Sequence, residues 1–155
     1  MRRSKIKFPD RIVVVAAIVL TAVTMALAAI GIGPRFITVT GAESVSIPVA
    51  NLQPGDIKFY SYRDPAGGQI RFILERYNDG RVQAAVDACQ QCAQYRKGYT
   101  ASGGYLVCRF CGNRYKLDAA PAGAASCSPI KLPVQVKGQT VKVDTSALEQ
   151  HQGLF

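Results

Sequence analysis

The chain has 155 residues, a formal net charge of +9 and a hydrophobic share of 48%. This length leaves room for one folded domain with a short appendage and excludes an array of several domains. Residues 35–155 hold fourteen Lys and Arg against nine Asp and Glu. That modest excess of positive charge favours anionic lipid or acidic proteins as partners, or a basic surface that is simply solvated.

The N-terminal segment combines a basic start with an uncharged apolar run. Residues 1–11 contain five Lys and Arg and one Asp, whereas residues 12–33 contain no charge and consist mainly of Val, Ala, Ile and Leu. Such a run is long enough to cross a bilayer as a helix, and the basic start favours a cytoplasmic N-terminus. We predict a cytoplasmic basic start at 1–11, followed by a transmembrane helix or uncleaved signal anchor at 12–33.

This topology predicts a single-pass protein of the cytoplasmic (inner) membrane, whose C-terminal domain faces the periplasm or the exterior. A cleaved signal peptide is the alternative, because Ala26-Leu27-Ala28 resembles a small-x-small cleavage site. Both interpretations place the rest of the chain across the membrane. The bilayer is therefore an expected partner, and nucleic acid is not.

Residues 34–43 are predicted to form a tether, and residues 44–155 an exported, mainly β domain. Beyond Ser44 the apolar residues recur with a period of two, which is typical of strands. Asn51 to Gly55, Asp64 to Gly68 and Asn78 to Gly80 have turn chemistry. The predicted strands run near residues 45–49, 57–62, 70–75 and 82–88.

The second half of the domain is predicted in less detail. Residues 105–107 and 115–117 are predicted strands, and residues 96–104 a loop with a tight turn. Residues 132–136 are expected to pair with 141–143 through Lys137-Gly138-Gln139. Thr145 or Ser146 is a candidate cap for a short helix that contains Leu148.

Four cysteines occur as two Cys-x-x-Cys pairs, Cys89 with Cys92 and Cys108 with Cys111. Two such pairs facing each other form the four-thiolate cage that Zn²⁺ or iron accepts. The predicted fold class is therefore a mainly β domain with a rubredoxin-like or zinc-ribbon-like metal site, preceded by one transmembrane helix. Cys127 is a fifth cysteine. Three roles are open for it: a further ligand, a thiol next to the site, or a small buried apolar residue.

The residues around the cysteines suggest further roles. Positions 89–116 contain no carboxylate but five cations, which would offset thiolate charge or merely solvate loops. Asp87 is a candidate for orienting the first pair, or else an exposed strand residue. His151 is the only histidine, so no nucleophile–base arrangement is convincing, and an electron carrier is favoured over an enzyme. The cations are Arg96, Lys97, Arg109, Arg114 and Lys116.

The pattern around the cysteines resembles the membrane iron-sulfur containing, FtrD-like family. The likeness spans about residues 44–145, although Ser126-Cys127-Ser128-Pro129 departs from the family's Gly-Cys-Asn-Pro. It rests on Asp87-Ala-Cys89-Gln-Gln-Cys92, Lys97-Gly98-Tyr99, Tyr105-Leu-Val-Cys108-Arg-Phe-Cys111-Gly112 and Cys127-Ser-Pro129.

This resemblance implies a membrane-anchored redox protein that uses Cys89, Cys92, Cys108 and Cys111 for iron or an iron–sulfur cluster. It also implies partners in iron uptake: an iron permease and an exported iron-binding or cupredoxin protein. The first hypothesis is thus an extracytoplasmic electron-transfer component of an iron uptake system. The alternative is a structural zinc ribbon that binds a membrane protein, and a weaker third idea is a carrier or sensor of Cu⁺.

Overall fold

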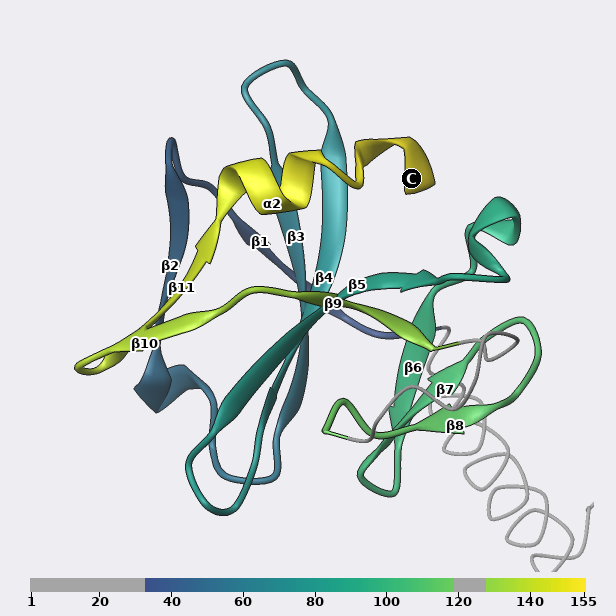
Figure 1. Ribbon diagram of the computed structural model, residues 1–155, viewed down its shortest axis with the longest axis horizontal. Coiled ribbons are helices and arrows are strands. Elements are labelled where there is room, and N and C mark those ends of the chain that lie inside the picture. Colours follow the sequence, from purple (N-terminus) through teal and green to yellow (C-terminus); the bar gives the residue numbers. More distant parts are fainter. Residues whose placement is uncertain (1–32, 119–127) are drawn as a thin grey trace, which may run out of the picture. The chain divides into compact units, whose positions relative to one another are not determined.

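The computed structural model describes residues 33–118 and 128–155, and the fold below is that of the compact unit Pro34–Phe155. Its described part contains eleven strands in three sheets (Figure 1). The largest sheet has five strands in the order β1-β3-β4-β5-β9. These are β1 (Phe36–Val39), β3 (Ile57–Arg63), β4 (Gln69–Arg76), β5 (Val82–Cys89) and β9 (Pro129–Leu132).

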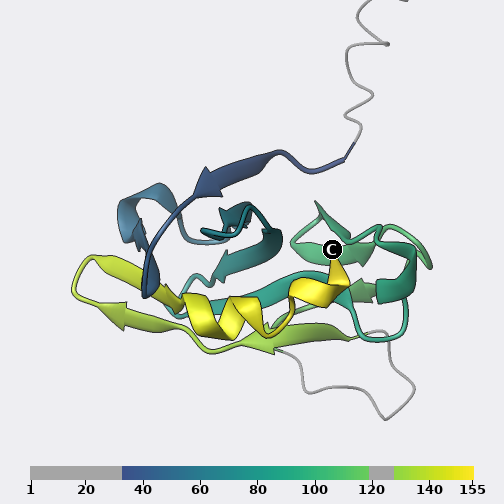
Figure 2. The ribbon, with the colours of Figure 1, turned by 90° about the horizontal axis from the view of Figure 1, so that it is seen from above.

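Two smaller sheets of three strands complete the architecture. One consists of β10 (Gln135–Lys137), β11 (Thr140–Asp144) and β2 (Ser44–Pro48), and the other of β6 (Tyr99–Ser102), β7 (Tyr105–Cys108) and β8 (Arg114–Tyr115). Helix α2 (Thr145–Glu149) follows β11, and short 3-10 helices lie at Val49–Asn51, Ala93–Tyr95 and Gln152–Leu154. Seen from above, the two smaller sheets lie at opposite ends of the unit (Figure 2).

The five-stranded sheet buries both of its faces, and each face has its own core. Alternate side chains of β5 show the division: Ala84 and Val86 belong to the core shared with β2, β11 and α2, whereas Ala85 and Cys89 belong to the core shared with β6 and β7. Because side chains alternate along a strand, one strand can contribute to both cores. The cysteine region is therefore packed against one face of the sheet.

Most of the predicted strands and turns are observed. The antiparallel pairs β3–β4 and β4–β5 are joined by the turns predicted at residues 64–68 and 78–80. Gly67 and Gly80 have φ of +89° and +88°, a backbone conformation that favours glycine. The predicted hairpin through Lys137-Gly138-Gln139 is the β10–β11 pair. Local turn chemistry and alternation were sufficient for these elements.

Four features differ from the sequence expectation. Residues 36–39, within the predicted tether, form β1 and pair in parallel with β3. Residues 99–102, predicted as part of a loop, form β6. The apolar stretch at 129–137 divides between two sheets, since β9 pairs with β5 and β10 with β11. Helix α2 has Asp144, not Thr145 or Ser146, at its N-cap, with no capping bond from that side chain; the Thr145 hydroxyl donates to the carbonyls of Ala42 and Glu43.

The expected fold class is correct in its mainly β character, but its rubredoxin-like or zinc-ribbon-like metal site is wrong. The two Cys-x-x-Cys pairs do not form a separate small domain. The sheet β6-β7-β8, which lies in sequence between β5 and β9, packs on one face of the larger five-stranded sheet. Among residues 33–118 and 128–155, no helix is long and apolar enough to cross a membrane. The helix expected at 12–33 falls, except for Gly33, outside the described residues.

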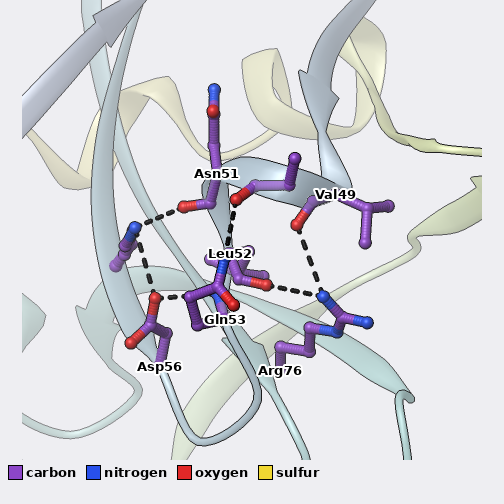
Figure 3. Close-up of polar contacts among 8 residues, drawn as sticks. Val49, Asn51, Leu52, Gln53, Asp56 and Arg76 are labelled. Atoms are coloured by element: carbon purple, nitrogen blue, oxygen red, sulfur yellow. Dashed lines mark hydrogen bonds and ion pairs between the residues drawn. The ribbon is translucent and has the colours of Figure 1, made fainter.

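The loop between β2 and β3 is held by side chains from neighbouring strands (Figure 3). Arg76, at the end of β4, donates through Nη1 to the carbonyl oxygens of Leu52 at 2.8 Å and Val49 at 3.5 Å. Within the loop, the Gln53 amide donates to Asp56 Oδ2 at 2.8 Å. These bonds satisfy backbone groups of the loop between β2 and β3, which also contains the buried Leu52.

We predict that Arg76→Gln lowers the free energy of unfolding by about 1–2 kcal/mol, because the partly buried carbonyls of Leu52 and Val49 lose a charged donor. Urea denaturation of the two proteins measures the difference. The control is Arg81→Gln, which removes the exposed pair with Asp79 and a contact over the ring of Tyr77, and should change the midpoint by much less. Equal effects of the two substitutions would contradict this role for Arg76.

Candidate metal centre

The first cysteine pair begins at the last residue of a buried strand. Cys89 ends β5, and both Cys89 and Cys92 are buried. The turn after Cys89 is tied to the neighbouring chain segment, since the Gln90 amide donates to the Ser128 carbonyl at 3.3 Å. The chain then forms the 3-10 turn Ala93–Tyr95, which starts from Cys92. The packed sheet therefore determines the position of this pair.

The second cysteine pair directs backbone N–H groups at a sulfur. The amides of Phe110 and Cys111 hydrogen-bond the sulfur of Cys108, at the end of β7. Gly112 has φ +76° and its amide donates to the Cys108 carbonyl at 2.9 Å, so the chain curls back tightly here. Burial raises the pKa of the Cys108 thiol, and the two amide bonds act against that increase because they favour the thiolate.

Three cysteine sulfurs converge between the two pairs. The ligand atoms of Cys89, Cys92 and Cys108 lie within 4.8 Å of one another, and all three residues are buried. They belong to an apolar core with Phe59, Ile73, Tyr99, Leu106 and Leu117. Cys111 is exposed and is not part of this group, although its side chain hydrogen-bonds that of Cys108. Thiolates in such surroundings are suitable ligands for iron.

Asp87 holds the segment that connects the two pairs. Its carboxylate is 1% exposed, and Oδ1 accepts a hydrogen bond from the Tyr99 amide at 2.7 Å. Arg71 Nε lies 3.6 Å from Oδ2. Burial raises the pKa of the Asp87 carboxyl to about 6, while the Tyr99 amide and the charges of Arg71 and Arg109 oppose this increase. Asp87 is thus a buried structural acceptor rather than an exposed strand residue.

Gly98 makes this contact possible. A Cβ built on Gly98 would lie 2.4 Å from a carboxylate oxygen of Asp87, and its φ is +66°. On its other side, the Gly98 carbonyl accepts a hydrogen bond from the Arg109 amide at 2.9 Å. The residue therefore links the strand of the first pair with the backbone of the second. No larger side chain fits without displacing Asp87.

Arg71 connects Asp87 with segments from both ends of the described unit. Its guanidinium lies over the ring of Phe36, 5.5 Å from the centroid, and over that of Phe155, 5.1 Å away. Nη2 also approaches the Arg96 carbonyl at 3.4 Å. A positive charge between two rings and a buried carboxylate is stabilised from several sides. Sequence reasoning missed this residue, because it is 16 positions from Asp87 and gives no local signal.

Tyr99 reaches the cysteines with its side chain as well as its amide. The residue is fully buried, and its hydroxyl hydrogen-bonds the side chain of Cys89. Burial strongly raises the pKa of Tyr99, and the neighbouring sulfurs of Cys89 and Cys108 raise it further. The phenol is therefore protonated at all physiological pH values, and it can act as a donor to a thiolate.

The structure places the other predicted site residues as follows. The five cations predicted around the cysteines are all exposed. Arg114 and Lys116 lie over the ring of Tyr105, at 4.5 and 5.0 Å from its centroid. Cys127 falls outside the described residues. His151 precedes the 3-10 turn Gln152–Leu154 and is not among the described metal-capable groups.

The comparison with protein families gives the class of protein. The model of the membrane iron-sulfur containing protein FtrD-like family matches residues 52–155, about two thirds of the chain. The chain belongs to this family, as its cysteine pattern suggested. The family's description places its members at a membrane and gives them iron and sulfur.

Two solved structures are similar to this chain. One is the complex of reduced oxygenase and oxidized ferredoxin in carbazole 1,9a-dioxygenase, with 18% identity, a TM-score of 0.46, and coverage of 67% of this chain and 94% of the other. The other is a putative NADH-dependent nitrite reductase small subunit from Mycobacterium tuberculosis, with 18% identity, a TM-score of 0.41, and coverage of 66% and 96%. No curated protein matches the sequence.

The site fits the cofactor that the family implies. Three buried thiols within 4.8 Å of one another, backbone amides directed at Cys108 and the tyrosine hydroxyl at Cys89 are the surroundings that an iron–sulfur cluster requires. The cofactor of this protein is therefore an iron–sulfur cluster, and the choice between iron and zinc that the spacing left open is resolved by the family.

We predict that Gly98→Ala destabilises the site by about 2 kcal/mol or more, because the new methyl group overlaps the buried Asp87 carboxylate. Denaturant unfolding and the iron content per chain are the measurements. Gly104→Ala is the matched control: φ is +72°, but no atom of the part of the chain that the structure describes lies within 4 Å of its added Cβ. Its cost should be limited to backbone strain of about 1 kcal/mol. If both variants unfold at the same midpoint, the Asp87 contact is unimportant.

Proposed function

We propose that this chain is a one-electron carrier that serves iron uptake from outside the cytoplasmic membrane. The observation that carries the proposal is the convergence of Cys89, Cys92 and Cys108 in a buried apolar core, within a chain of the FtrD-like family. When bound, an iron–sulfur cluster supplies one-electron oxidation and reduction. The extracytoplasmic location is supported by the basic start and the following apolar run of the sequence.

The ligands that we propose are Cys89, Cys92, Cys108 and Cys111. The first three need no rearrangement to share one group, since their sulfurs already lie within 4.8 Å. Cys111 is the ligand nearest to solvent, and its contact with Cys108 keeps it beside the group. Two neighbouring residues position the cysteines. Asp87 fixes the segment that connects the two pairs, and the Tyr99 hydroxyl donates to the sulfur of Cys89.

Charge and burial together favour an electron carrier. Hydrogen bonds from Phe110, Cys111 and Tyr99 to the sulfurs stabilise negative charge on them, and Arg96 and Lys97 line the same cavity as the cysteines and add positive charge there. Both effects favour the reduced state, which is the more negative one. The apolar core excludes water from three of the four sulfurs. As partners we propose an iron permease and an exported iron-binding or cupredoxin protein, as in the systems with which the family is associated.

The full-length protein, purified without oxygen, is expected to contain iron and acid-labile sulfide and to be coloured, and dithionite should bleach it. Cys108→Ser should lose iron and colour, because it removes a buried ligand whose sulfur accepts two amide bonds. Elemental analysis and visible spectra are the measurements. A colourless protein that contains one zinc per chain would refute the proposed function.

Tyr99→Phe is expected to lower the reduction potential by about 60 mV, which corresponds to about 1.4 kcal/mol for one electron. The reason is that a donor to the Cys89 sulfur is lost, and that donor favours the more negative state. A spectroscopic redox titration measures the midpoint. Tyr60→Phe is the control, because the Tyr60 hydroxyl is buried and has no hydrogen-bond partner among the described residues. An unchanged midpoint in Tyr99→Phe would exclude the role of this hydroxyl.

A further inference from the structure

One exposed surface next to the cysteines combines stacked aromatic rings with unpaired positive charge. We call it the knuckle surface and define it by Tyr95, Arg96, Lys97, Arg109 and Phe110. We propose that it is the docking site of an acidic protein that carries one electron. This inference rests on the proposed electron-carrier function, and it adds where the partner binds and what charge the partner presents.

Two aromatic side chains form the apolar centre of this surface. The rings of Tyr95 and Phe110 stack with centroids 3.7 Å apart and an interplanar angle of 8°. Nevertheless the two residues are 47% and 48% exposed. Tyr95 follows the first cysteine pair and Phe110 lies inside the second, so the stack bridges the two pairs. Large exposed aromatic residues cost solvation free energy and are typical anchors of protein interfaces.

Positive charge borders the stack. Arg96, Lys97 and Arg109 are exposed, and none of them forms an ion pair with a carboxylate of residues 33–118 or 128–155. The Arg109 Nη1 group donates to the Lys97 carbonyl at 3.2 Å, which keeps these cations close together. Along the chain, the acid nearest to Arg96 and Lys97 is Asp87, which is buried. A partner with an acidic face would complement this charge and be steered toward it.

The knuckle surface lies directly beside the sulfurs. Phe110, Arg96 and Lys97 line the same small cavity as Cys89, Cys92 and Cys108. Cys111, the exposed member of the two cysteine pairs, is adjacent to Phe110. A redox protein bound here would be close enough to the cysteines to exchange an electron, whereas a lipid surface bound here would cover the cysteines and block such a partner. A second copy of this chain would bring charge of the same sign, which opposes self-association at this surface.

The docking step transfers an electron and forms no bond. In the direction that we propose to test, the reduced centre of the acidic carrier loses one electron and the oxidised centre of this protein gains it. No proton or leaving group is needed for the balance. The probe is reduced plant-type ferredoxin, which is acidic, and its reaction with the oxidised full-length protein is followed by stopped-flow absorbance.

Lys97→Glu should lower the second-order rate constant about tenfold at low ionic strength, and added salt should reduce the difference. Lys137→Glu is the matched control, because Lys137 is also exposed, and it lies on β10, in the sheet that packs on the other core. It produces the same change of net charge and should alter the rate constant by less than about twofold. Equal effects of the two substitutions would overturn the proposal, since the charge would then act globally.

A second pair of variants tests the aromatic stack. Tyr95→Ser should lower the rate constant about fivefold, whereas Val136→Ser, at a residue that is 50% exposed, should leave it unchanged. Visible spectra must match those of the parent protein, which shows that the redox group is intact. If Lys97→Glu instead abolishes binding to anionic vesicles and leaves the ferredoxin reaction unaltered, the surface binds lipid. If Tyr95→Ser instead dissociates a dimer, the occupant is a second copy.

Failure of this proposal is distinguishable from failure of the proposed function. Docking is measured separately by calorimetric titration of oxidised ferredoxin into the oxidised protein, which involves no electron transfer. If dithionite reduces the protein but ferredoxin binds equally well with and without the Lys97→Glu substitution, the protein is a carrier with another docking site. A protein that binds at the knuckle surface but contains no reducible group is not an electron carrier.

Discussion

The hydrogen bond from the Tyr99 amide to the buried Asp87 carboxylate is the contact on which the cysteine site depends. Asp87 and Cys89 lie on the same face of β5 because they are two residues apart, and that face packs against β6 and β7. By holding the start of β6, Asp87 places the hairpin that carries Cys108 opposite Cys89. Gly98 leaves room for the carboxylate, and Arg71 supplies the compensating charge.

The two faces of the five-stranded sheet divide the molecule's tasks. One face packs on β2, β11 and α2 and forms the larger apolar core, which contains no cysteine among the described residues. The other face carries the three buried cysteines. The rigid sheet positions them, so the connecting loops can expose Cys111, Tyr95 and Phe110 without loosening the site. Membership of the FtrD-like family and this arrangement together define an iron–sulfur protein suited to electron transfer.

Sequence reasoning succeeded where the signal was local and failed where it was not. Turns at Asp64–Gly68 and Asn78–Gly80 and the strands on either side followed from glycine, proline and alternation. The parallel pairing of β1 with β3 gives no local signal, since it joins residues more than 20 positions apart. The rubredoxin-like expectation came from cysteine spacing alone. Spacing does not show whether the two Cys-x-x-Cys pairs form their own domain or pack on a larger sheet.

By itself, the sequence determined the two Cys-x-x-Cys pairs, the positive charge around them, most strands and the family resemblance, because each is a property of neighbouring residues. Only the tertiary structure decided that Cys111 is exposed while the other three are buried, and that Asp87 and Tyr99 face the cysteines. It also brought Tyr95 and Phe110 into one stack. These relations depend on which face of the sheet each strand presents and on contacts between distant segments, which a linear pattern does not contain.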